Sequence, residues 1–294
     1  YMECYICFFL LNFRQANLVF QRVQEWRRFY PEASFVVVDN DSRDGSYKRI
    51  EDVFEGDKKV EVVRNISNLG YAVGNNLGVR EAIKMFDPEF VAIMNPDVVI
   101  FDKRIVPSII DAFSKDKNLA ICTGLMLNSC RMLNPKSIAW KIPDKLDDCL
   151  LNLPFFSSRF GVSKYKLYRV EENGIIYVEV VPGSFFVAKT EYFTKMGMFD
   201  ENTFLYCEER ILGWKAKKHG LKIAIVPGFF FLHDHPKKRN PFSTMMRSYY
   251  RLIKSRFYYN KVYNSLPRWF VLPLFSLSAV VGFLLKALMW VIRK

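Results

Sequence analysis

The chain has 294 residues, of which half are hydrophobic, so it can bury a sizeable core and is not a disordered protein. Its formal net charge is +13, but twelve of the 43 basic residues and none of the 30 acidic residues fall between positions 236 and 294. The first 235 residues are therefore nearly neutral, and the positive charge belongs to the C-terminal segment.

The six cysteines show no pattern of disulfide pairing. Cys4 and Cys7 form one CxxC, but no second pair and no nearby histidine completes a zinc site, so we interpret them as small buried hydrophobic residues. This usage predicts a reducing, cytoplasmic setting. The opening residues lack the basic, apolar and cleavage-site pattern of a secretory signal, and we expect none.

Strand-like and helix-like segments alternate through the first 125 residues. Alternation of this kind predicts βαβ units and a mostly parallel sheet, with ligands at the carboxyl ends of its strands. The strands are expected at 5–11, 34–38, 60–63, 90–94 and 119–124, and the helices at 15–30, 46–54, 72–86 and 103–114.

Two of these strands end in carboxylates. The run "FVAIMNPDVVI" (90–100) is apolar up to Met94, and Pro96 then ends the strand, so Asp97 is expected on the rim of the sheet. The run "VVVDNDSRDGS" ends its strand at Asp39. A calcium loop would be an alternative there, but Arg43 stands where an oxygen ligand is needed and the glycine comes one place late.

A loop rich in glycine and asparagine, "RNISNLGYAVGNNLGVREA" (64–82), precedes the third expected helix. Glycines at 70, 74 and 78 allow close approach of the backbone, and a helix N-terminus favours anions. The pattern is not the GxGxxG of dinucleotide-binding proteins, so no dinucleotide is implied, and a purely structural role stays open.

The segment from 126 to 177 is irregular and informs little. Residues 178–201 read as a strand, a Pro-Gly break, more strand, a short helix and a glycine turn, and they lead into a helix that begins near Glu208 and Glu209. Acidic residues in a first helical turn also occur simply because they complement the helix dipole. A final strand (221–236) ends in His233, Asp234 and His235.

The C-terminal segment pairs basic residues with a long apolar stretch. The run at 247–261 is basic and aromatic, and the seventeen residues from 269 to 285 carry no charge, which suits an anionic membrane surface. Pro273, Gly282 and Lys286 weaken a membrane span, so a helix or hairpin in the membrane plane competes with it. A buried helix or an oligomer contact is the alternative. Nucleic acid binding is not expected, because no recognition motif accompanies the run.

Together these segments resemble family 2 glycosyltransferases with the GT-A fold, particularly the bacterial rhamnosyl- and galactosyltransferase-like members that build cell-surface polysaccharides. The resemblance covers residues 4 to about 235. It rests on five blocks in register, namely "VVDNDSRDGS", "NLGYAVGNNLG", "NPD", "GMFDENTFLYCEE" followed by "LGWKAKKHG", and "FLHDH". It implies an α/β fold whose mostly parallel, Rossmann-like central sheet is flanked by helices and followed by a C-terminal membrane-associating helical segment.

The resemblance also implies roles for individual residues. Asp97 and His233 would hold Mg²⁺ or Mn²⁺, with His235 as the alternative to His233. Glu209 occupies the place of the catalytic base, with Glu208 as its alternative. The residues implied to bind the nucleotide-sugar are Asp39, Asn40, Asn68, Gly70, Asn76, Asn95 and Asp97.

The implied activity is metal-dependent, inverting transfer of a sugar from a nucleotide-sugar to a saccharide acceptor. That acceptor is expected to be lipid-linked, and the enzyme to work at the cytoplasmic face of the cell membrane, held peripherally or by a C-terminal anchor. We divide the chain into a nucleotide-sugar-binding half (1–125), an acceptor-binding and catalytic half (126–235), a basic aromatic helical segment (236–265) and an apolar membrane-associated segment (266–294).

Some residues depart from the family pattern. Glu209 replaces the usual aspartate, Asn95 removes the first carboxylate of the D-x-D element, Ile211 stands where another acid is common, and Lys215 where arginine is common. A catalytically degenerate scaffold or partner subunit of the same fold is therefore an alternative. A sugar-phosphate nucleotidyltransferase is a further one, but its glycine-rich, Arg- and Lys-bearing phosphate signature is absent near the N-terminus.

Overall fold

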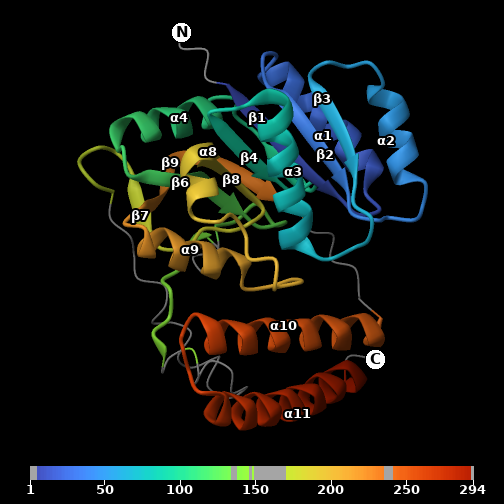
Figure 1. Cartoon of the computed structure of the whole chain (residues 1–294), viewed down its shortest axis with the longest axis vertical. Coiled ribbons are helices and arrows are strands. Elements are labelled where there is room, and N and C mark those ends of the chain that lie inside the picture. The colour runs from blue at the N-terminus through green and yellow to red at the C-terminus, as the bar shows by residue number, and fades with distance from the viewer. Residues whose placement is uncertain (1–4, 134–137, 146–147, 149–169, 235–240, 293–294) are drawn as a thin grey trace.

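A computed structural model describes residues 5–133, 138–145, 148, 170–234 and 241–292. Within these residues one nine-stranded sheet runs in the order β3-β2-β1-β4-β8-β6-β9-β5, and β7 pairs with β9 (Figure 1). The strands are β1 (Ile6–Asn12), β2 (Ser34–Asp39), β3 (Val60–Arg64), β4 (Phe90–Met94), β5 (Val98–Ile100), β6 (Leu119–Leu127), β7 (Ile176–Val178), β8 (Phe185–Lys189) and β9 (Lys222–His233). The helices of this part are α1 (Ala16–Phe29), α2 (Ser46–Phe54), α3 (Tyr71–Phe86), α4 (Ile105–Lys115), α8 (Thr190–Lys195) and α9 (Glu208–Lys218).

The sheet is mostly parallel, as the sequence predicts. Strands β1 to β4, β6 and β9 share one direction, whereas β8 runs antiparallel between β4 and β6, and β5 and β7 run antiparallel to β9. The predicted boundary at residue 125 falls inside β6, so one sheet continues from the first half of the chain into the second. The assignment of donor and acceptor roles to those halves stays a prediction.

Each face of the sheet carries its own apolar core. On β1, Phe8 and Leu10 point to one face and Cys7 and Phe9 to the other, because successive side chains of a strand alternate. Helices α1, α2 and α4 cover the first face, and α3, α8 and α9 cover the second. The hydrophobic spacing at 15–30, which predicts one apolar helical face, is confirmed by α1, whose Trp26 is fully buried.

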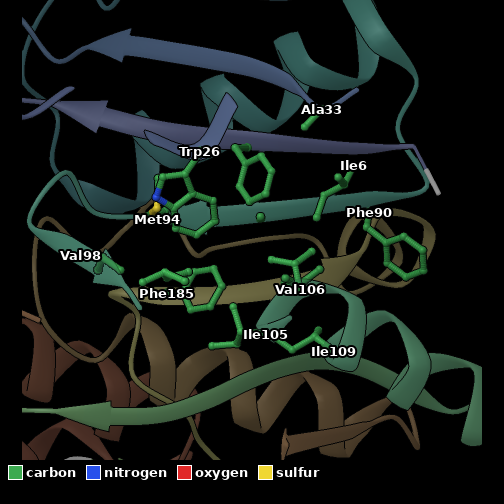
Figure 2. Packing of buried hydrophobic residues seen from close by; sticks show 14 of the residues in the cluster. Ile6, Trp26, Ala33, Phe90, Met94, Val98, Ile105, Val106, Ile109 and Phe185 are labelled. Carbon is green, nitrogen blue, oxygen red and sulfur yellow. The ribbon is translucent and has the colours of Figure 1, made fainter. Parts of the chain in front are cut away.

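Figure 2 shows the first core, where Trp26 of α1 and Ile105 and Ile109 of α4 gather around Phe185 of β8. The rings of Trp26 and Phe185 meet edge to face, with centroids 5.6 Å apart. Burial of one such large side chain stabilises the fold by roughly 1.5–3 kcal/mol. This packing fixes β4 and β8 side by side, and the ends of those two strands carry much of the site.

Helix α3 lies close against the sheet because it has glycines where side chains would collide. A Cβ at Gly78 would lie 1.9 Å from Cε2 of Phe9, and one at Gly74 would lie 2.5 Å from Cδ1 of Leu11. Two of the three glycines in the glycine and asparagine loop therefore serve helix–sheet packing. The helix begins at Tyr71, one residue before its predicted start at residue 72.

Strand β9 is irregular in its middle. Thr123 of β6 pairs with Ile225, but Leu125 two residues later pairs with Phe230, so β9 has extra residues around Pro227 and Gly228. Gly228 has a left-handed φ of 84°, and a Cβ there would have nothing within 4 Å. Glycine is therefore favoured here by the backbone conformation and not by close packing.

Two C-terminal helices, α10 (Phe242–Val262) and α11 (Arg268–Ile292), lie side by side beyond α9 (Figure 1). Gly282 of α11 faces Tyr249 of α10, where a Cβ would lie 1.7 Å from the hydroxyl oxygen, and that hydroxyl donates to the carbonyl of Ser278 at 3.0 Å. Helix α11 continues through Pro273, which does not end it. By length and composition α11 is able to cross a membrane.

Candidate active site

The carboxyl ends of the parallel strands meet at one edge of the sheet. Asn12, Asp39 and Arg64 are in register across β1, β2 and β3. The last residue of β4, Met94, pairs with the first residue of β8, Phe185. The polar residues that follow or precede these positions therefore face the same edge, as the strand-end pattern of the sequence predicts.

Asp39 is held rigidly at the end of β2. Its Oδ1 accepts from Nδ2 of Asn12 at 2.6 Å, and its Oδ2 accepts from the backbone N–H of Ser42 at 3.1 Å. The turn that follows carries two non-glycine residues with left-handed φ, Asp41 (56°) and Arg43 (54°). The Arg43 guanidinium, hydrogen-bonded to Asp41, holds the pKa of that carboxyl below its usual value.

Asn40, Asn68 and Gly70 form one hydrogen-bonded group, although 28 residues separate the first two. Asn40 Nδ2 donates to Asn68 Oδ1 and to the carbonyl of Gly70, each at 3.2 Å. Asn65 Nδ2 completes the group by donating to Asn40 Oδ1 at 3.0 Å. The structure thus joins the ends of β2 and β3 to the loop before α3, and it brings these predicted residues together.

Gly70 has a second role, which is steric. Its φ is 105°, and a Cβ there would lie 2.2 Å from the carbonyl oxygen of Phe204. The next residue, Tyr71, donates its backbone N–H to that same carbonyl at 2.8 Å. Only glycine allows this contact between the loop before α3 and the chain that leads into α9.

Asn76 lies apart from this group. Its Nδ2 donates to the carbonyl of Phe199 at 3.0 Å and to Glu201 Oε1 at 2.9 Å, and its Oδ1 accepts from the N–H of Phe199 at 3.0 Å. The side chain is 2% exposed. In this structure Asn76 ties α3 to the 199–201 turn, and its assignment to the nucleotide stays a prediction.

Asp97 and His233 come together across two strands, although 136 positions separate them. His233 ends β9 and is in register with Val98 of β5, and its Nε2 lies 3.3 Å from Asp97 Oδ1. Asp97 lies at the predicted edge of the sheet, where it is only 6% exposed. The cause is the β5–β9 pairing, in which Asp234 also donates its N–H to the carbonyl of Asp97.

A cavity of about 420 Å³ lies beside this pair. Asn95, Glu208, Glu209 and His233 all line it, so four of the predicted site residues share one space. The other lining residues are Tyr71, Met126, Trp140, Pro182, Gly183, Ser184, Leu205 and Tyr206.

A hydrogen bond from the backbone of Gly183 orients the side chain of Glu209. Its Oε1 accepts from the N–H of Gly183 at 3.3 Å, and a Cβ on Gly183 would lie 2.9 Å from the same oxygen. Gly183 belongs to the Pro-Gly break before β8, whose Ser184 carbonyl accepts from the N–H of Asn95. The break therefore places a backbone donor, rather than a side chain, against the predicted base.

The two glutamates are adjacent, with Glu208 buried and Glu209 partly buried. Burial, together with the charge of Glu209, raises the pKa of Glu208 to about 8. Burial raises the pKa of Glu209 as well, against the opposing effects of the Gly183 N–H, the Arg210 charge and His233. Two carboxylates this close do not both ionise readily, so the pair titrates as a unit. Glu208 Oε1 is buried and has no hydrogen-bond partner among the described residues.

The backbone just before the glutamates is in an unusual conformation. Tyr206 and Cys207 have left-handed φ values of 77° and 71°, and α9 begins at Glu208. Each such residue costs of order 1–3 kcal/mol, so surrounding contacts must hold it in place. Clustering of this kind is common where a side chain has to be presented to a ligand.

Eight of the lining residues were not predicted as site residues, among them Tyr71, Trp140 and Gly183. The hydroxyl of Tyr71 donates to the carbonyl of Gly183 at 2.7 Å, which closes one wall of the cavity. The backbone of Trp140 is fixed, because its backbone N–H donates to the carbonyl of Val180 at 3.1 Å. Tyr71 directly follows Gly70, so the loop pattern contained a signal for it, whereas Trp140 lies in the irregular segment and had none.

The chemistry of Asp97 and His233 fits a divalent cation. The carboxylate oxygen of Asp97, in the turn before β5, and the imidazole nitrogen of His233, at the end of β9, lie 3.3 Å apart and would converge on one ion. The described residues contain no group of three or more His, Cys, Asp and Glu side chains that would hold a metal. An ion held by Asp97 and His233 alone would take its other ligands from substrate and water. His235, the alternative ligand, lies outside the described residues.

The sequence also matches known proteins. A family model described as glycosyl transferase family 2 matches residues 18–173, just over half of the chain. The rhamnosyltransferase WbbL of Escherichia coli (strain K12) is 26% identical over 195 residues, which cover 65% of this chain and 69% of WbbL. The low-salt glycan biosynthesis hexosyltransferase Agl10 of Haloferax volcanii is 22% identical over 217 residues, which cover 74% of this chain and 64% of Agl10.

Two solved structures show the same fold. GalNAc-T7, crystallised with UDP, GalNAc and Mn²⁺, matches with a TM-score of 0.56 and 15% identity, over 81% of this chain and 45% of its own. The mannosyltransferase PcManGT of Pyrobaculum calidifontis, in complex with GDP-Man and Mn²⁺, matches with a TM-score of 0.55 and 16% identity, over 98% of this chain and 79% of its own. The predicted GT-A architecture is confirmed.

Proposed function

The chain belongs to glycosyl transferase family 2, and from that premise we propose that it transfers a sugar from a nucleotide-sugar to a saccharide acceptor with inversion, with Glu209 as the base. The observation that carries the proposal is the shared cavity. It places both glutamates, Asn95 and His233 at the carboxyl edge of the sheet.

The acceptor hydroxyl is a poor nucleophile and must lose its proton as the new bond forms. A carboxylate within hydrogen-bond reach of that hydroxyl contributes about a hundred- to ten-thousand-fold to the rate. Glu209 suits this task because the Gly183 N–H orients it and because Arg210 and His233 favour its ionised form. Glu208, whose pKa is about 8, would hold the proton that the pair keeps at neutral pH.

The donor would lie across the ends of β1, β2 and β4. Asp39, fixed by Asn12 and Ser42, offers an acceptor to the nucleoside, and the group of Asn40 and Asn68 borders the same edge. Asp97 and His233 would hold Mg²⁺ or Mn²⁺. When bound, that ion would neutralise charge on the departing diphosphate. The Mn²⁺ in both structural relatives supports this part of the proposal.

We propose further that the enzyme works at the cytoplasmic face of a membrane, on a lipid-linked acceptor, in the synthesis of surface polysaccharide. Helix α11 supports this, because its residues that do not face α10 form an exposed apolar surface. The members of this surface are Trp269, Phe270, Leu272, Leu277, Val280, Leu284, Leu288, Met289, Val291 and Ile292. The positive charge of the C-terminal segment would add attraction to anionic lipid.

The activity is tested by incubating the full chain with Mn²⁺ and a panel of UDP-, dTDP- and GDP-sugars and measuring release of the nucleotide. Glu209→Gln should lower kcat by about a hundred- to ten-thousand-fold and leave donor affinity nearly unchanged, because only the base is lost. Glu191→Gln, an exposed acid on α8, is the matched control. Full turnover by Glu209→Gln would remove Glu209 from the role of base, and an inactive wild type with every donor would favour a scaffold.

The metal proposal has its own measurement, titration calorimetry of UDP and GDP with and without Mn²⁺. Asp97→Asn should weaken Mn²⁺-dependent nucleotide binding at least about tenfold, because one of two protein ligands is lost. Asp111→Asn, on the exposed side of α4, controls for loss of a negative charge. Equal Mn²⁺ dependence in wild type and Asp97→Asn would contradict the assignment.

The membrane proposal is tested by flotation of the full chain with phosphatidylglycerol vesicles. A triple substitution on the exposed surface of α11, Leu277→Asp, Leu284→Asp and Leu288→Asp, should abolish flotation, because charged side chains do not enter lipid readily. Val53→Asp, at an exposed valine of α2, is the control. Flotation of the triple variant at the wild-type level would show that α11 is not the anchor.

A further inference from the structure

Besides packing on α11, helix α10 is hydrogen-bonded to the chain that leads into α9. Ser255 donates its hydroxyl to the carbonyl of Leu205 at 2.8 Å. Tyr258 donates to Asp200 Oδ2 at 2.8 Å, and the Tyr263 hydroxyl bonds the same oxygen. The contacts thus reach the start and the middle of the segment Asp200–Glu209, which we call the base-carrying segment.

A buried ionic group extends these contacts to the first turn of α9. Arg210, which directly follows Glu209, pairs through Nη1 with Asp148 Oδ1 at 2.5 Å. Asp148 Oδ2 accepts from Nδ2 of Asn260 at 2.7 Å, and Asn260 is fully buried on α10. The guanidinium of Arg210 also lies 5.1 Å from the ring centroid of Tyr259. Removing one member of such a buried group leaves the others without compensation.

The base-carrying segment needs external support. Its residues from Glu201 to Cys207 form no helix or strand, and Tyr206 and Cys207 have left-handed φ. From the α3 side the N–H of Tyr71 holds the carbonyl of Phe204. From the other side, the Ser255 hydroxyl holds the next carbonyl, that of Leu205. Helices α3 and α10 therefore each donate a hydrogen bond to one of two neighbouring residues, Phe204 and Leu205, shortly before the two glutamates.

One apolar cluster of α10 is shared with α11. Ile253 packs with Val271 and Phe275 of α11, in a cluster separate from both cores of the sheet. The polar side of α10 is thus the side that meets the base-carrying segment. A helix that served only to add stability would not need to place its hydroxyl and amide groups against one catalytic turn.

We infer that α10, together with Tyr263 directly after it, is a positioning element of the active site. Ser255, Tyr258, Asn260 and Tyr263 hold the base-carrying segment so that Glu208 and Glu209 point into the cavity. This inference rests on the proposed role of Glu209 as base. The positioning residues themselves line no part of the cavity and touch no reacting atom. Because α10 also packs against α11, a shift of these two helices would move the base-carrying segment and its two glutamates as well.

The test uses the full chain with the double substitution Tyr258→Phe and Tyr263→Phe, and separately Ser255→Ala. Both remove hydroxyls and leave the apolar packing in place. Tyr250→Phe, at a tyrosine of α10 that is 58% exposed, is the matched control. Two quantities are measured: kcat and KM for the UDP-, dTDP- or GDP-sugar that the wild type turns over, and amide hydrogen exchange across residues 196–218.

We expect kcat to fall about ten- to a hundredfold with KM for the donor unchanged, the scale for displacing a catalytic group by about 1 Å. Amide exchange should rise in the base-carrying segment and stay at the control level in the sheet. Wild-type kcat in both variants would overturn the inference. So would a lower melting temperature with faster exchange throughout the chain and an unchanged kcat per folded molecule, since that result describes a purely structural helix.

The exchange measurement keeps this test separate from that of the proposed function. If Glu209→Gln retains full turnover, the base role fails, whereas faster exchange confined to residues 200–209 in the tyrosine variant would still show that α10 holds this segment. If Glu209→Gln is inactive and the α10 variants match the control in both kcat and exchange, the base role stands and the positioning role fails.

Discussion

The two sides of the site are built in different ways. On the donor side, Asn12, Asp39 and Asn40 stand at or just after the ends of their own strands, and the strand register aligns them. On the catalytic side, the cavity is assembled from a helix start, a Pro-Gly break and the end of β9, which lie far apart in the sequence. Position on the donor side follows from local strand ends, whereas position on the catalytic side depends on how distant segments cross.

This difference decides which substitutions are informative. A change at a strand end alters one group, because the sheet holds the neighbours. A change on the catalytic side acts through contacts between segments, so a residue that touches no substrate can still move the glutamates. Three substitutions test this difference between the donor side and the catalytic side.

The largest effect is expected at Gly70, where the two sides meet. Gly70→Ala adds a Cβ 2.2 Å from the carbonyl of Phe204 at a φ of 105°, so we expect a loss of about 2–5 kcal/mol in the free energy of unfolding, from strain and overpacking together. Gly45→Ala is the matched control, since its φ is 80° but nothing lies within 4 Å of the new carbon. Urea unfolding measures both, and equal losses would mean that the contact with Phe204 does not matter.

A smaller effect, confined to catalysis, is expected at Gly183. The Cβ of Gly183→Ala would lie 2.9 Å from Glu209 Oε1, so the glutamate must move, and kcat should fall about tenfold with little change in melting temperature. Glu209→Asp in the same chain withdraws the carboxylate by one methylene and makes room for the alanine. The double variant should therefore lose less activity than the sum of the two single effects, and strict additivity would contradict direct contact.

The third effect concerns pH and stability. The folded pKa of Glu208, about 8, lies above the ordinary value of 4.5, so the folded state binds more protons than the unfolded state between these values. The stability tied to this group is present below pH 4.5 and is lost as the pH rises toward 8, with a slope of at most about 1.4 kcal/mol per pH unit.

Glu208→Gln should remove that decline. Melting temperatures of wild type and variant across pH 5–8.5 check it, with Glu191→Gln as a control that keeps the wild-type slope. Parallel curves for wild type and Glu208→Gln would mean that Glu208 is ionised in the folded protein throughout this range.

Much of the fold was predictable because the hydrophobic periods are strong. The predicted strand at 90–94 matches β4, and the predicted helix at 46–54 matches α2. Strand ends also predicted that Asn40 and Asn68 would share one edge, and their side chains are hydrogen-bonded to each other. These are local signals combined with one rule of parallel sheets.

The rest depended on contacts that no local pattern encodes. The sequence does not show that the amide of Asn76 bonds the 199–201 turn, because nothing near Asn76 indicates which segment crosses over α3. It also does not show that Asn260, in the basic aromatic segment, bonds Asp148 in the irregular segment. Such pairs become visible only when the topology fixes which distant residues are neighbours.

The irregularity in the middle of β9 has a consequence for how this sequence changes over evolutionary time. A strand has two faces, so the number of residues in the insert around Pro227 and Gly228 decides, by its parity, on which face every later side chain emerges. His233 meets Asp97 because that number is right. A relative with one residue more or fewer there could keep every motif letter and still present its histidine to the wrong side, so counting between the motifs matters as much as reading them.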